Sequence, residues 1–188
     1  MSIILVNILV AVFGLAISKV MPAFIKRFSN EEKIFDGTLK DDFKFDVKLA
    51  LITPLTLIAL LFFFGVSEKF FIYSFVSIIL IMDAFIDIKA QIIPNALNMT
   101  GFVVGMLYMY YKLIFDLNTG IDLLLGMFVG AGIFLLIAAF ALVAYKKEGM
   151  GLGDVKLMGM LGLFFGVKNI FQIFILSFAV GAVISILL

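Results

Sequence analysis

The chain has 188 residues, of which 64% are hydrophobic and only 14% charged, and its formal net charge is +1. Soluble domains carry roughly a quarter charged residues, so this excess of apolar side chains requires lipid as the solvent. His and Cys are absent, which excludes histidine triads, cysteine nucleophiles and imidazole or thiolate metal sites, and the near-neutral charge gives no reason to expect nucleic-acid binding.

Long apolar runs predict an all-α membrane protein, a polytopic bundle of about six to seven transmembrane helices in a single domain, 1–188. The first helix, 3–25, is retained rather than removed as a secretory signal, because no basic residue precedes its long apolar run. Further helices are predicted at 49–66, 69–88, 96–115 and 121–145. The last stretch, 155–188, is interrupted near Gly166–Asn169 and predicts a short helix followed by a full one.

One segment, 26–48, breaks the apolar pattern because 12 of its 23 residues are charged, and we interpret it as a solvated loop. Basic residues near span ends favour the cytoplasmic side. With the N-terminus outside, ten basic residues would face the cytoplasm and three the exterior, leaving out Lys19 as intramembrane. We therefore expect the loops 26–48, 89–95 and 146–154 at the cytoplasmic face.

Two acidic residues stand toward the end of the predicted helix 69–88. Acidic groups at membrane depth are costly and therefore point to function. Asp83 and Asp87 are four residues apart, so they share one helix face. Asp83 could tune Asp87 or line a substrate groove, or it could be a hydrogen-bonded structural carboxylate. Pro94, before Asn95, is expected to end one helix and open the next.

A second cluster, GMGLGDVK, covers 149–156. Its alternating glycines, among them Gly151 and Gly153, disfavour a helix interior and allow close backbone approach. We expect them to form a loop that shifts to admit a substrate. Asp154 then stands at the start of a helix, where an N-cap role would explain the acid but not the glycines. Lys156 could stabilise an ionised carboxylate or could simply mark the cytoplasmic border.

Both acids are predicted at cytoplasmic helix ends, so Asp87 and Asp154 could meet although 67 positions separate them. Two facing carboxylates do not both ionise comfortably and share a proton. In an aspartic protease the ionised carboxylate takes a proton from water while the protonated one polarises the scissile carbonyl, without metal or cofactor. From spacing alone, the pair could equally serve proton or cation transport.

The segments IDIKAQIIPN (86–95) and GLGDVKLMG (151–159) together resemble the A24 family of type IV prepilin peptidases and its archaeal preflagellin relatives, which are GxGD intramembrane aspartyl proteases. The resemblance implies that Asp87 and Asp154 are the catalytic pair. We also expect supporting roles in substrate binding or at the active site for Gly151, Gly153, Lys156, Pro94, Asn95 and Asp83. The resemblance also implies a hydrolase that removes the short basic leader of a type IV prepilin-like preprotein, of a pilus or protein-secretion system, at the cytoplasmic membrane.

The chain departs from longer members of that family in two places. The Cys-free loop 26–48 stands where those members carry a methyltransferase domain, which implies cleavage without methylation. A further closing span is missing after Leu188, which suggests self-association as a homo-oligomer. Two other functions stay open, a small proton- or cation-coupled transporter and a membrane assembly subunit. Small-residue pairs at Gly101/Gly105, Gly126/Gly130 and Gly162/Gly166 predict close helix packing.

Overall fold

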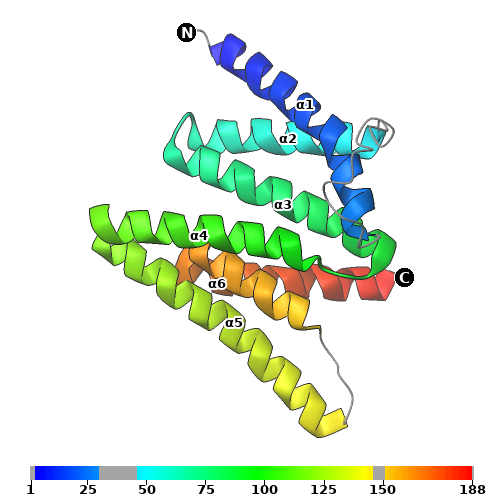
Figure 1. The fold of residues 1–188 in the computed structure, drawn as a ribbon, viewed down its shortest axis with the longest axis vertical. Coiled ribbons are helices and arrows are strands. Elements are labelled where there is room, and N and C mark those ends of the chain that lie inside the picture. The colour runs from blue at the N-terminus through cyan, green and yellow to red at the C-terminus, as the bar shows by residue number, and fades with distance from the viewer. Residues whose placement is uncertain (1–2, 30–45, 146–150, 188) are drawn as a thin grey trace. The chain divides into compact units, whose positions relative to one another are not determined.

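A computed structural model of the chain describes residues 3–29, 46–145 and 151–187, and Figure 1 shows its helices. No strand occurs within these ranges. The helices are α1 (Ile3–Ser29), α2 (Val47–Phe64), α3 (Glu68–Ala90), α4 (Asn95–Phe115), α5 (Leu117–Tyr145) and α6 (Leu152–Leu187). Five of them are long and apolar enough to cross a membrane. The prediction of an all-α, polytopic membrane protein is therefore confirmed.

Helix α4 was also predicted as a span, over 96–115, but it is not among those five in the part of the chain described. The helix itself forms where predicted. Polar residues make α4 less apolar than the other helices. Asn95 and Asn98 lie near its start, and three tyrosines and Lys112 lie near its end. Lys112 lies over the rings of Tyr108 and Tyr111, at 5.6 and 5.7 Å from their centroids. Amphipathic aromatic side chains of this kind favour a membrane–water interface.

The chain divides into two compact units, Met1–Leu97 and Asn98–Leu188. In the first unit, α1 and α2 pack closely where Gly14 meets Pro54. A Cβ atom at Gly14 would lie only 2.8 Å from the Pro54 Cα. Thr53 is fully buried and donates a hydrogen bond to the Met21 sulfur at 3.5 Å. The core of this unit consists of Met21, Ile25, Leu49, Met82, Ile86 and Leu97.

The charged segment between the first two helices is shorter than the predicted loop 26–48. Helix α1 continues to Ser29, with Lys26 and Arg27 in its last turn, where basic groups complement the helix dipole. Helix α2 begins at Val47 because Asp46 caps it, its carboxylate accepting a bond from the Lys48 amide at 2.9 Å. The rest of the predicted loop, 30–45, lies outside the described residues.

In the second unit, α5 and the first half of α6 meet along a seam of four glycines: Gly126, Gly130, Gly159 and Gly162. A Cβ atom at Gly126 would lie 2.6 Å from the Gly162 carbonyl oxygen, and one at Gly159 would lie 3.2 Å from the Ala131 Cβ. Gly105 of α4 packs against Leu163. The predicted close packing is confirmed for Gly105, Gly126, Gly130 and Gly162. We call the four residues of α5 and α6 the glycine seam.

Helix α6 changes direction along its length, as its orange and red parts in Figure 1 show. The break lies at Gly166, whose φ of 73° and ψ of 178° are not helical. The predicted interruption near Gly166–Asn169 is therefore confirmed. The Asp122 carboxylate of α5 contacts Gly166 and accepts a hydrogen bond from the Val167 amide at 3.3 Å. It thus caps the second half of α6 from a neighbouring helix.

A conventional cap stands at the start of α5. The Asp116 carboxylate accepts bonds from the Thr119 hydroxyl at 2.6 Å and the Thr119 amide at 3.3 Å. These hydrogen bonds hold the pKa of Asp116 below its ordinary value. Because the folded-state pKa is lowered, the stabilisation is present above the unfolded pKa of about 3.9 and is lost as the pH falls through the folded value.

We therefore expect Asp116→Ala to lower the thermal midpoint slightly at pH 7, because the exposed first turn of α5 loses its cap. The difference from wild type should shrink as the pH falls below about 4. Thermal unfolding of both proteins in detergent, from pH 7 to below about pH 4, measures this difference in midpoint. A difference that stays constant down to the lowest pH would show that the carboxylate charge does not matter.

Candidate active site

Asp87 lies in the last turn of α3 and is exposed. The helix ends after Ala90 because Gln91 adopts a left-handed conformation (φ 53°, ψ 36°), and its amide donates to the Asp87 carbonyl oxygen at 2.8 Å. Pro94 is buried directly before Asn95, the first residue of α4. Pro94 therefore precedes the first residue of α4 as predicted, whereas α3 ends through the left-handed Gln91 rather than at the proline.

Asp83 lies one turn earlier on α3 and is only 4% exposed. Neither carboxylate oxygen has a hydrogen-bond partner among the residues described. The interpretation of Asp83 as a hydrogen-bonded structural carboxylate therefore finds no support, and a role beside Asp87 stays a prediction. A buried polar group without partners costs roughly 1–3 kcal/mol of folding free energy.

Asp83→Leu, which keeps the side-chain shape, should therefore raise the free energy of unfolding by roughly 1–3 kcal/mol. Denaturant unfolding in micelles measures this. The matched control is Asp122→Leu, which removes a carboxylate that does accept a hydrogen bond and should lower stability. If Asp83→Leu destabilises the protein as Asp122→Leu does, Asp83 has a structural partner.

Asp154 lies in the first turn of α6 and is half-buried. The helix begins at Leu152, earlier than the predicted start at 155, so Asp154 stands inside the first turn rather than at the cap. Its amide donates to the Gly151 carbonyl oxygen at 3.2 Å. Gly153 therefore lies in the first turn of α6 rather than in the predicted loop, and the helix dipole stabilises the acidic group of Asp154 beside it. The remaining glycine of the predicted loop, Gly149, lies outside the described residues.

Three other predicted site residues are exposed. Gly151 stands directly before α6, and a Cβ atom placed there would lie 3.9 Å from the Asp154 Oδ2 atom. Lys156 follows Asp154 by two positions on α6, and Asn95 opens α4. Asp83, Asp87, Pro94 and Asn95 belong to the first unit, whereas Gly151, Gly153, Asp154 and Lys156 belong to the second. The pairing of the two catalytic candidates stays a prediction.

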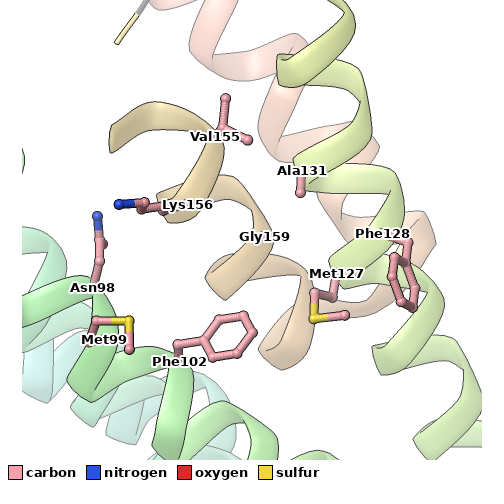
Figure 2. A pocket seen from close by; sticks show the side chains of 9 residues that line it. All are labelled: Asn98, Met99, Phe102, Met127, Phe128, Ala131, Val155, Lys156 and Gly159. Carbon is pink, nitrogen blue, oxygen red and sulfur yellow. The ribbon is translucent and has the colours of Figure 1, made fainter. Parts of the chain in front are cut away.

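A pocket of about 390 Å³ lies within the second unit, between α4, α5 and the start of α6 (Figure 2). Its lining includes Val155 and Lys156, the two residues that follow Asp154, and Asn98 of α4. Sequence reasoning missed Asn98, although an amide side chain inside an apolar stretch was a usable signal. In the part of the chain that the structure describes, no three His, Cys, Asp or Glu side chains are grouped so as to hold a metal ion.

Comparison with known families supports one of the functions that the sequence left open. The sequence model of the type IV leader peptidase family matches residues 73–186, more than half of the chain. The chain belongs to this family. The leader peptidase match begins within α3 and includes both Asp87 and Asp154, and it confirms the predicted family resemblance. It makes the protein a protease, and the apolar helices make it an integral membrane protein. Comparisons with curated proteins and with solved structures gave no match.

Proposed function

We propose that this leader peptidase is an intramembrane aspartyl endopeptidase that removes the short basic leader of type IV prepilin-like preproteins. Asp87 and Asp154 would activate the attacking water. The observation that carries the proposal is the family match over 73–186, a range that contains both Asp87 and Asp154. We also propose that the whole chain, 1–188, forms one peptidase domain, and that it cleaves without methylating the product.

The local structure around each acid supports this chemistry. Asp87 stands in the last turn of α3, next to the left-handed Gln91, and Asp154 stands in the first turn of α6, after Gly151. Helix ends can receive an extended peptide, whereas helix interiors cannot, because their backbone groups and faces are already packed. Each carboxylate also has some solvent access, as a residue that activates water requires.

The reaction follows from the charge of the pair. Two adjacent carboxylates hold one proton between them, because two negative charges at short range repel. The ionised carboxylate accepts a proton from water, which attacks the scissile carbonyl carbon. The protonated carboxylate donates a hydrogen bond to the carbonyl oxygen and stabilises the developing negative charge. The C–N bond then breaks as the proton taken from water passes to the leaving amine, and no further group has to enter the reaction.

The excess of basic residues in the loops 26–48, 89–95 and 146–154 supports a cytoplasmic active site with the N-terminus outside. This topology requires α4 to cross the membrane together with the five more apolar helices, its polar residues lying near its two ends. Asp87 and Asp154 both adjoin these loops. A preprotein whose hydrophobic helix rests in the cytoplasmic membrane would then present its leader junction at the depth of the two acids. The substrate is thus a membrane-anchored preprotein with its leader on the cytoplasmic side.

The direct test is cleavage of a tagged model prepilin by the full-length protein in lipid nanodiscs. We expect a product shortened by the leader, with a single new N-terminus identified by mass spectrometry, and no loss of activity after chelator treatment. A well-folded protein that leaves several different prepilins intact would contradict the proposal. Proton flux in liposomes containing such a protein would instead favour transport.

A further inference from the structure

The pocket beside Asp154 has the properties of a binding site. Its volume of about 390 Å³ falls within the range of ligand pockets. Apolar side chains form most of its wall, and Figure 2 shows them surrounding one common space. The lining residues are Asn98, Met99, Phe102, Met127, Phe128, Ala131, Val155, Lys156 and Gly159. All of them belong to the second unit.

Asn98 brings a polar amide group into this apolar pocket, and that amide lacks a hydrogen-bond partner. Its side chain is only 2% exposed, and neither its Oδ1 nor its Nδ2 atom has a hydrogen-bond partner in the described part of the chain. Buried amide groups in folded proteins are nearly always hydrogen-bonded, so an unpaired one calls for an explanation. An amide offers a donor and an acceptor side by side, which is the complement of a peptide group.

The position of the pocket connects it to the reaction. Val155 and Lys156 line it, and Asp154 directly precedes them in the first turn of α6. Figure 2 shows the ends of the Lys156 and Asn98 side chains directed toward one another at one end of the pocket. A peptide whose carbonyl group reaches Asp154 therefore has its adjacent residue within reach of this space.

We propose that the pocket holds the substrate next to the scissile bond: Asn98 pairs with one backbone amide of the extended segment, and the apolar wall receives one apolar side chain. This inference rests on the proposed peptidase function and adds a subsite to it. The Lys156 ammonium at the rim disfavours a basic side chain, so the residue bound here lies on the hydrophobic side of the cleavage point rather than in the leader.

The test uses Asn98→Leu in the full-length protein, with the tagged model prepilin as substrate. Without substrate, the variant should unfold at the same temperature as wild type or higher, because it removes an unpaired buried amide. With substrate, KM should rise roughly tenfold while kcat stays within about twofold, since two hydrogen bonds used for binding are lost. Lower stability with an unchanged KM would overturn the proposal, because Asn98 would then be structural.

The matched control is Asn169→Leu, the same change at an exposed position outside the pocket, which should leave KM unchanged. A second measurement does not depend on cleavage. A photo-crosslinking amino acid replaces Phe102 in the Asp154→Asn protein, which is then mixed with the same prepilin. Crosslinks at Phe102 but not at the exposed Tyr111 would support the subsite even if wild type proved inactive, and their absence would overturn it.

Discussion

Asp154→Asn and Asp87→Asn should each reduce leader cleavage by roughly 10³-fold or more, because in the proposed mechanism each removes one half of a carboxylate pair that works as a unit. Asn neither accepts a proton from water nor supplies one to the leaving amine, although its shape is that of Asp. The double variant should be no worse than either single variant. Cleavage of the tagged prepilin in nanodiscs, with product quantified over time, measures all three.

The matched control is Asp122→Asn, which neutralises an acid that caps the break in α6 and lies outside the proposed pair. Asn can still accept a hydrogen bond from the Val167 amide, so cleavage and stability should both be retained. Thermal unfolding of every variant separates lost chemistry from lost folding. Cleavage at near wild-type rate by either single variant, in protein purified free of wild type, would contradict the assignment of the pair.

Gly162→Leu should lower the free energy of unfolding by roughly 3 kcal/mol or more. Gly162 lies on the glycine seam, where a Cβ atom would overlap the Gly126 backbone. Backbone atoms cannot move aside as a flexible side chain can, so α5 and α6 would have to separate. Denaturant unfolding measures the loss, and cleavage should fall with it because Asp154 lies on the same helix.

Gly132→Ala provides the comparison for the seam. Gly132 lies on α5 as Gly126 does, but nothing would lie within 4 Å of a Cβ atom placed there. Because Ala favours a helix by up to about 1 kcal/mol over Gly, this variant should be slightly more stable than wild type. If Gly162→Leu proved as well tolerated as Gly132→Ala, the close approach of α5 and α6 would not contribute to stability.

Hydropathy predicted the helices well because each is a long apolar run bounded by charged or helix-breaking residues. The boundaries were less accurate where capping decides them. Asp46 starts α2 at Val47, and the dipole of α6 accommodates Asp154 in a first turn that begins at Leu152. The break at Gly166 was predictable from local sequence. The capping contact from Asp122 was not, because 45 positions separate Asp122 from Val167.

The candidate site was predictable only where short motifs carry it. Asp87 with Pro94, and Gly151 with Asp154, form recognisable local patterns. Asn98 lies in no local sequence pattern, and its proposed role depends on a burial and a lack of hydrogen-bond partners that only the folded structure reveals. Asp83 was noticed as an acid in a membrane helix, but the absence of a partner for it among the described residues required the structure.

Because of the glycine seam, the walls of the pocket differ in how readily their residues can be substituted during evolution. The walls from α5 and α6 are in direct backbone contact at Gly126 and Gly162. A larger residue at either position would force the two helices apart and destabilise the fold. The wall from α4, with Asn98, Met99 and Phe102, is not held by such backbone contact, since at Gly105 the α4 backbone packs against the side chain of Leu163 in α6. A descendant adapting to a new preprotein would therefore alter α4 first and inherit the α5–α6 pair unchanged.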